Sequence, residues 1–397
     1  MSEAAIQPLV PESRVLGPLL VQAADLIAEG HRLEAAAGQL SGMLAPLLRA
    51  MNSYYTNKIE GQQTRPADIE RALLRQFDAD EKQAKRQRLA LAHIRAEQAL
   101  EDHLPATRAE LYLPTFVARL HQQLYFELPA NERLTDEGAP LVPGEFRLGQ
   151  VTAGRHLAPP ASAVPALLRA WQNGYAGLPG LELAVVGAVC SHHRLLWVHP
   201  FPDGNGRTAR LHTHLVLGAL GLTHGLWSPL RGMARHQEAY YARLNNADLP
   251  RRNDLDGRGS LSQEELVGFA SWLLELSLDQ ARFMRDLLSL GSLKARLQDL
   301  LLSLSARPWA IGSEQSVIKP EALEALHYTA LFGPIERARF MAMTGLPPRT
   351  ARRVLTSLLD YGILQTTTSR APVTFAVPLK SLRYVFPRLW PEAEAGE

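Results

Sequence analysis

Apolar residues recur at intervals of three and four through most of the chain, which is the spacing of amphipathic helices. Residues 17–50 carry this pattern and predict two helices with a break near Gly30. Residues 66–101 predict a charged helical stretch, and Leu111–Tyr125 predicts another amphipathic helix. The run Leu181–Leu196 is apolar on nearly every side, so we expect a buried helix there. The pattern therefore predicts a mainly helical fold.

Residues 138–165 interrupt the helical pattern with repeated glycines and prolines, which exclude a long helix. Within this stretch, Glu145–Val151 alternates weakly between apolar and polar residues and predicts a short extended flap. Because loops on a rigid helical scaffold often carry recognition, we expect this flap to take part in binding.

A second irregular stretch, residues 254–265, partly matches the spacing of a calcium-binding loop. Arg258, however, places a cation where a ligand belongs. Ser262 and Glu265 instead suit a capping box, in which a serine caps the next helix and a glutamate reaches back to it. We therefore expect a helix start here.

The pattern changes from about residue 316 onward, where the remaining chain is long enough for a small domain. Ile335–Met343 and Pro348–Tyr361 predict helices on either side of a turn at 344–347. Two short strands are expected after Gly362. The order of helix, turn, helix and hairpin is that of a winged helix-turn-helix.

Charge and composition limit the possible partners. The 397 residues include 42 basic and 40 acidic side chains, so the near-neutral balance gives no global case for binding nucleic acid or a membrane. Cys190 is the only cysteine, which excludes an internal disulfide and fits a reducing compartment. The first residues lack the pattern of a signal peptide, and no apolar run is expected to reach the roughly 18 residues that span a bilayer. We expect a soluble, cytoplasmic protein.

The candidate chemistry centres on a glycine-rich loop that leads into a helix near residue 206. Free backbone N–H groups and the positive end of the helix dipole make such a place an anion site. Arg207 and Arg210 lie on one face of the first turn. Two positive side chains over backbone amides suit a polyphosphate better than a single carboxylate.

The other residues of this loop fit a reaction at phosphorus. Asp203 offers a hard oxygen ligand for Mg²⁺, and Gly204 and Gly206 permit close approach of the backbone. The side-chain amide of Asn205 is a possible donor to a phosphate oxygen. His199, just before the loop, is able to take a proton from an incoming hydroxyl group. The set predicts an in-line displacement.

The stretch from His199 to Arg210 resembles the signature of the Fic family, His-x-Phe-x-Asp/Glu-Gly-Asn-Gly-Arg-x-x-Arg, and every fixed position is present. His192 also falls where the family often has a histidine. Gly144–Arg147 and Pro159–Pro160 resemble the family's target-docking flap. The resemblance covers roughly residues 110–280 and implies a helical bundle with a short β-hairpin flap.

The resemblance implies protein AMPylation, the transfer of AMP from ATP to a Ser, Thr or Tyr hydroxyl of a target protein with release of pyrophosphate. ATP would be the co-substrate and Mg²⁺ the cofactor. The roles it implies are as follows: His199 as base, Asp203 as Mg²⁺ ligand, Gly204, Asn205 and Gly206 as anion hole, Arg207 on the phosphates, Arg210 on the γ-phosphate, Tyr240 and Tyr241 in the nucleotide site, and Arg147 and Val151 on the flap that docks the target.

The segment Thr56–Gly61 has two interpretations. Taken alone, it is a helix end with a glycine C-cap. It is also similar to the family's inhibitory-helix motif, Ser/Thr-x-x-x-Glu-Gly/Asn. That similarity implies that Glu60 pairs with Arg210 and blocks productive binding of the γ-phosphate, since a carboxylate held against a guanidinium replaces the anion.

These patterns predict the following organisation: 1–105 as an N-terminal helical region with the inhibitory motif, 106–290 as the Fic catalytic domain, 291–315 as a linker, and 316–397 as the winged helix-turn-helix domain. Expected partners are ATP and a target protein, with self-modification and a homodimer as further options. Two alternatives stay open at this stage. One is the reverse reaction, removal of AMP. The other is a nucleotide-sensing regulator that binds DNA through Arg349, Arg352 and Arg353 of the winged helix.

Overall fold

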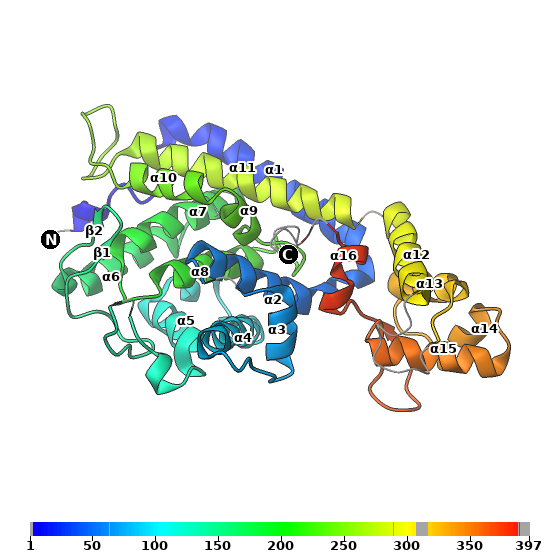
Figure 1. Ribbon diagram of the computed structural model, residues 1–397. Coiled ribbons are helices and arrows are strands. Elements are labelled where there is room, and N and C mark those ends of the chain that lie inside the picture. The colour runs from blue at the N-terminus through cyan, green and yellow to red at the C-terminus, as the bar shows by residue number, and fades with distance from the viewer. Residues whose placement is uncertain are drawn as a thin grey trace.

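The fold is a helical body with a smaller C-terminal lobe, as Figure 1 shows. The computed structural model describes residues 3–62, 64–135, 137–288, 290–306, 317–387 and 389. The helices of the body are α1 (Ser13–Ala37), α2 (Ser41–Ile59), α3 (Pro66–Leu73), α4 (Glu81–Glu101), α5 (Pro114–Phe126), α6 (Val164–Tyr175), α7 (Leu181–Val198), α8 (Asn205–Ala219), α9 (Leu230–Arg235), α10 (Gln237–Ala247) and α11 (Gln263–Leu287). The lobe contains α12 (Leu290–Ala306), α13 (Leu323–Phe332), α14 (Arg337–Met343), α15 (Pro348–Tyr361) and α16 (Leu382–Val385).

Helix α7 lies at the centre of the body and confirms the expected buried helix. It packs against α1, α6, α8 and α11, and its residues from Ala184 to Leu195 are buried. Among the described residues, α7 is the one helix long and apolar enough to cross a membrane by length and composition alone, and 78% of it is buried inside the protein. The expectation that no apolar run reaches this length was therefore wrong, although burial on all sides is typical of a core helix.

The predicted break at Gly30 was wrong, because α1 continues through this residue to Ala37. The chain instead breaks at a short 3₁₀ turn, Gly38–Leu40, before α2 begins. Gly30 has a packing role: a Cβ added there would lie 2.7 Å from the carbonyl oxygen of Leu222. A glycine within a helix thus marks a close approach of another backbone rather than an end.

The extended part of the flap lies later in the chain than predicted. Residues 145–151 are irregular, and the short antiparallel pair lies just after them, between β1 (Thr152–Ala153) and β2 (His156–Leu157). Gly154 turns the hairpin with a positive φ of 59°. Weak alternation over seven residues located the flap, but the turn residue decided where its strands pair.

The start of α11 confirms half of the predicted capping box. Ser262 Oγ accepts a hydrogen bond of 3.2 Å from the backbone N–H of Glu265, as an N-cap residue does. The carboxylate of Glu265 pairs with Arg252 at 2.6 Å instead of reaching back to Ser262. Asp256 accepts from the N–H of Glu264 at 2.8 Å, so a carboxylate of the loop satisfies the helix end rather than a calcium ion.

The C-terminal lobe contains the elements expected in the order expected. Helix α15 follows α14 after a turn and ends at Gly362, whose φ is 87°. Strands β3 (Leu364–Gln365) and β4 (Thr374–Phe375) then pair antiparallel. Helix α12 packs on α13 and α16, so its residues belong to this lobe and not to a linker. Residues 307–316 and 390–397 of the expected linker and C-terminal domain lie outside the described residues.

The close approach at Gly30 generates a stability prediction. We expect Gly30→Ala to lower the free energy of unfolding by about 1–3 kcal/mol, because the added methyl group overpacks against a backbone carbonyl and outweighs a gain in helix propensity of about 1 kcal/mol. Chemical denaturation followed by circular dichroism measures this. Gly42→Ala in α2 is the control, since a Cβ there meets nothing within 4 Å. Equal stability of the two variants would contradict the packing role.

Candidate active site

The loop between α7 and α8 is held in shape by side chains that bond to its backbone. His199 ends α7 in the left-handed conformation, with a φ of 50°. The side-chain amide of Asn205 accepts from the N–H of Phe201 and donates to its carbonyl oxygen, both at 2.9 Å. Because Asn205 is buried and its amide bonds within the loop, the expectation that its side chain serves a phosphate is corrected. It positions the loop instead.

His121 of α5 packs against the same loop. Its ring stacks on Phe201 with centroids 3.9 Å apart and an interplanar angle of 7°. Nδ1 accepts a bond of 2.8 Å from the N–H of Gly144, which fixes the proton on Nε2. Nε2 therefore donates to the carbonyl oxygen of Asp203 at 3.2 Å. Sequence reasoning missed this residue, whose only signal was a histidine on the apolar face of a predicted helix.

His199 has the geometry of a base. Its Nδ1 lies 3.2 Å from the carbonyl oxygen of Leu196, which is only an acceptor, so Nδ1 carries the proton and Nε2 keeps its lone pair. Burial lowers the pKa of His199 to about 4, and the nearby charge of Arg147 adds to this effect. The imidazole is therefore neutral at physiological pH and ready to accept a proton at Nε2.

Arg147 bonds to backbone groups within the protein, and a docking role for it stays a prediction. Its side chain is buried, with 3% of the residue exposed. The guanidinium donates to the carbonyl oxygens of His199 at 2.7 Å and Gly149 at 2.9 Å, and also to that of Pro159. Its own N–H donates to the carbonyl oxygen of Pro200 at 2.9 Å. Arg147 thus ties the flap to the loop that carries the base.

The exposed side of the flap carries two leucines among polar residues such as Gln150 and Arg155. Leu148 is 97% exposed and Leu157 is 67% exposed, whereas Val151 is partly buried. The carbonyl oxygen of Val151 accepts from the N–H of Ala158 at 3.2 Å. A role for Val151 in docking a target stays a prediction, and the two leucines are exposed apolar side chains of the flap.

Helix α8 begins directly at the glycine-rich loop. Its N-cap, Gly204, has a φ of 75°, and a Cβ there would lie 2.3 Å from the hydroxyl oxygen of Tyr125, so only glycine fits. Arg207 donates to that hydroxyl group at 2.6 Å and to Oε1 of Gln62 at 3.1 Å. The Asp203 carboxylate accepts from the N–H of Gly204 and is partly exposed near the end of the loop.

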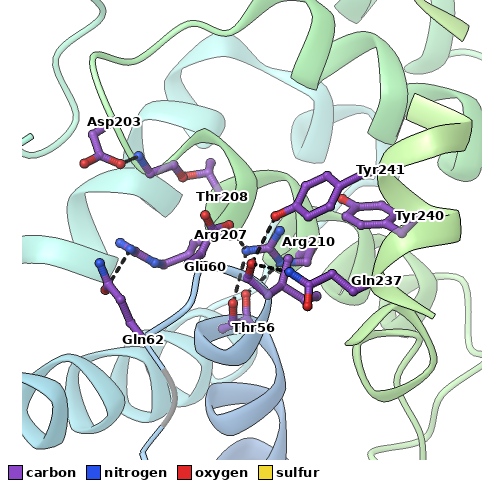
Figure 2. Close-up of polar contacts among 12 residues, drawn as sticks. Thr56, Glu60, Gln62, Asp203, Arg207, Thr208, Arg210, Gln237, Tyr240 and Tyr241 are labelled. Atoms are coloured by element: carbon purple, nitrogen blue, oxygen red, sulfur yellow. Dashed lines mark hydrogen bonds and ion pairs between the residues drawn. The ribbon is translucent and has the colours of Figure 1, made fainter. Parts of the chain in front are cut away.

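Arg210 is bound to the end of α2, as Figure 2 shows. Only 1% of Arg210 is exposed. Its Nε donates to Oγ1 of Thr56 at 2.8 Å, and Nη2 donates to the carbonyl oxygen of Thr56 at 3.3 Å. Nη2 also pairs closely with the Glu60 carboxylate, which confirms the predicted contact across 150 residues of sequence.

The Glu60 carboxylate occupies the anion position of α8. Burial by itself raises the pKa of Glu60, but the charges of Arg210 and Arg207 outweigh it, and the pKa is lowered. The group is therefore ionised. A Cβ added to Gly206 would lie 2.5 Å from Oε1 of Glu60, so the carboxylate sits directly on the first turn of the helix. An anion is expected at this place, and here the chain supplies its own.

Helix α10 fixes the end of α2. The carbonyl oxygen of Ile59, next to Glu60, accepts from Nε2 of Gln237 at 2.9 Å and from the hydroxyl group of Tyr241 at 3.0 Å. Tyr240 is buried, and its hydroxyl group bonds to Nε2 of His192 at 2.8 Å. The two tyrosines thus hold neighbouring helices, and a nucleotide-binding role for them stays a prediction. Gln237 carried no signal in the sequence.

Part of the chain is similar to known proteins. Residues 112–217 match the Fic/DOC family. A protein adenylyltransferase Fic from Drosophila mojavensis is 30% identical over 129 residues, which cover 31% of this chain and 26% of that protein. One from Aedes aegypti is 32% identical over 124 residues, 30% of this chain and 23% of that protein. The chain thus spans about a quarter of the length of these curated relatives.

Solved structures with Fic domains share the fold. The crystal structure of a Fic family protein from Desulfovibrio desulfuricans aligns with a TM-score of 0.51 at 17% identity, over 93% of this chain and 98% of that one. A Fic domain containing signaling protein from Bacteroides thetaiotaomicron aligns with a TM-score of 0.50 at 16% identity, over 68% of this chain and 97% of that one. The mainly helical architecture is therefore one found in Fic proteins.

The Fic/DOC segment contains only part of the site. It runs from just before α5 to within α8 and includes His121, His199 and both arginines of the signature. Glu60 and α10 lie outside it, on elements that pack against it. The Glu60–Arg210 contact thus joins the matched segment to a helix outside it.

The buried His121 generates a prediction about pH. Burial lowers its pKa from 6.5 to about 3 in the folded protein, so between these values the unfolded chain binds a proton that the folded chain does not. Stability is retained above pH 6.5 and falls as the pH drops below it, by up to about 1.4 kcal/mol per pH unit for this group.

We therefore expect His121→Gln to show a shallower fall in the free energy of unfolding between about pH 7 and about pH 5 than the wild-type protein. Glutamine retains an acceptor and a donor for the two backbone contacts. Chemical denaturation at several pH values measures the slope. An unchanged slope would show that His121 titrates in the folded protein.

Proposed function

We propose that this chain is a self-inhibited protein adenylyltransferase. It transfers AMP from ATP to a hydroxyl group of a target protein and releases pyrophosphate. The observation that carries this proposal is the arrangement of a neutral imidazole, His199, before a helix N-terminus that bears two arginines. The names of the curated relatives support the same activity.

The mechanism follows from the positions of these groups. The phosphates of ATP lie over the first turn of α8, where Arg207 and Arg210 neutralise their charge. Nε2 of His199 takes the proton of the incoming hydroxyl group. The hydroxyl oxygen then bonds to the α-phosphorus while the bond from that phosphorus to the bridging oxygen of pyrophosphate breaks.

Asp203 fits the role of a Mg²⁺ ligand. Its carboxylate is a hard oxygen donor, partly exposed beside the proposed phosphate position. The ion, when bound, supplies positive charge that stabilises the transferred and leaving phosphates. The flap, with Leu148 and Leu157 exposed, is the surface that would hold the target segment next to His199.

Inhibition results from competition for one cation. The Glu60 carboxylate pairs with Arg210 and lies over Gly206, which is the place proposed for the γ-phosphate. Both anions cannot occupy it. ATP is therefore held in an unproductive position, or excluded, until Glu60 moves away.

We expect Glu60→Gly to raise the rate of protein labelling by about 10- to 100-fold, because a charge-assisted hydrogen bond contributes about 1.5–3 kcal/mol. The measurement uses the purified full chain with labelled ATP and Mg²⁺, alone and with a cell lysate, and mass spectrometry of the adduct. Lys58→Ala, on the same turn of α2, is the control and should leave labelling unchanged. No rise with Glu60→Gly would contradict the inhibitory role.

A second substitution in the activated background tests the base. His199→Ala combined with Glu60→Gly should lose about 10²- to 10⁴-fold in rate while ATP binding persists, since proton transfer and not affinity is removed. Retained labelling would overturn the assignment of His199. An adduct with the mass of a phosphoryl group, rather than of AMP, would overturn the proposed reaction.

One observation favours a second function in the C-terminal lobe. We infer a winged helix-turn-helix from the order α14, turn, α15, β3 and β4. Arg349, Arg352 and Arg353 are exposed near the start of α15, the helix that would enter a DNA groove. These side chains could contact phosphates even though the net charge of the whole chain is close to zero.

The double variant Arg349→Ala/Arg352→Ala tests this. For the wild-type protein, affinity for duplex DNA should fall as salt concentration rises, and removing two phosphate contacts should reduce the log–log slope by about 2. Gel-shift titrations at several salt concentrations measure both slopes. Arg169→Ala, an exposed arginine of α6, is the control. An absence of DNA binding by the wild-type protein would favour a protein partner for this lobe.

A further inference from the structure

A buried polar cluster lies where α2, α4 and α8 meet, one turn of α8 beyond Arg210. It is separate from the proposed reaction, which uses none of its members. Its side chains are Arg49 and Asn52 of α2, His93, Glu97 and Glu101 of α4, and His214 of α8. On α4 the three residues are spaced by four, so they lie along one face of that helix.

Three of these side chains have the spacing of a metal site. Nε2 of His214 lies 3.4 Å from Oε1 of Glu97 and 3.4 Å from Oε1 of Glu101. All three possible ligand atoms lie within 4.8 Å of one another. Metal–ligand bonds of 2.0–2.1 Å in a tetrahedral zinc site place neighbouring ligand atoms about 3.3–3.4 Å apart. The distances from His214 match this value and exceed those of good hydrogen bonds.

Side chains that would orient these two carboxylates are also present. Nε of Arg49 donates to Oε2 of Glu101 at 2.7 Å, and Nδ2 of Asn52 donates to Oε1 of Glu97 at 2.8 Å. Such contacts orient carboxylate ligands in metal sites. Glu97 and Glu101 carry two negative charges, and Arg49 balances one of them. The other charge lies in a buried place and needs a further cation.

His93 supplies an independent sign of a missing partner. Only 1% of His93 is exposed, and neither ring nitrogen makes a hydrogen bond. Its Nδ1 lies 3.7 Å from Oε2 of Glu97, which also lacks a hydrogen bond. Side chains buried this deeply normally have a partner, so both point to a group between α4 and α8.

We propose that Glu97, Glu101 and His214 bind one divalent cation of the zinc class. His93 then hydrogen-bonds to a water that fills the fourth position. Imidazole with carboxylates suits zinc better than magnesium, which prefers oxygen ligands alone. The competing occupant is a proton on His214, which would bridge the two carboxylates without a metal. This proposal does not rest on the proposed enzymatic activity.

Cobalt(II) is the probe that distinguishes a bound metal from a proton on His214, because a tetrahedral Co²⁺ site with imidazole and carboxylate ligands absorbs visible light. We expect the full chain, after dialysis against a chelator, to bind one Co²⁺ with such absorption, and one Zn²⁺ to displace it. Glu97→Gln and His214→Gln should each abolish the absorption. Asn52→Ala should lower the metal affinity about 10- to 100-fold.

Two controls exclude other sites. His224→Gln alters the exposed group His31, Glu34 and His224, which has similar spacing, and should leave the absorption unchanged. Asp203→Asn, in the proposed catalytic loop, should do the same. Far-UV circular dichroism checks that each variant folds; if Glu97→Gln does not, the wild-type titration and Asn52→Ala decide.

The wild-type protein gives the clearest refutation. If the dialysed chain binds no Co²⁺ with tetrahedral absorption and no stoichiometric Zn²⁺, the cluster holds only a proton and the proposal is overturned. Absorption that persists in folded His214→Gln, or an Asn52→Ala affinity equal to that of the wild-type protein, would overturn it as well.

Discussion

The structure depends on a buried cation that must always have an anion. The guanidinium of Arg210 is almost completely enclosed, and a charge removed from water is costly unless it is paired. Thr56 and Glu60 meet this requirement, so the end of α2 is placed by electrostatics as much as by apolar packing. A ligand that displaces Glu60 from Arg210 is therefore expected to bring a negative charge of its own. A nucleotide phosphate satisfies that condition, whereas a neutral ligand does not.

The loop beside this pair is rigid because its backbone groups are satisfied by side chains from several elements. Asn205 closes the loop on Phe201, His121 supports it from α5, and Arg147 joins it to the flap. None of these three side chains is left to contact a substrate freely. Their function is to hold His199 and the first turn of α8 in fixed positions, which is how a site becomes pre-organised for catalysis.

Much of the fold and the site could be predicted from the sequence, for reasons that particular residues make clear. The apolar run of α7 and the glycine-rich start of α8 depend on local pattern, and both were found. The Glu60–Arg210 pair was predicted only through a family motif, because no local rule joins residues 150 positions apart. Gly30 was misread, and the contacts of Arg147 were not foreseen, because both depend on distant backbone atoms. His121 was overlooked for the same reason.

Covalent continuity gives the Glu60–Arg210 contact a further property. Glu60 and Arg210 belong to one chain, so the carboxylate is present at an effective local concentration that dilution does not change. The strength of the proposed self-inhibition is therefore independent of how much protein a cell makes. Only a competing anion, or a partner that pulls α2 away, shifts the balance. The contacts of Gln237 and Tyr241 to Ile59 raise that local concentration further by restricting where the end of α2 can move.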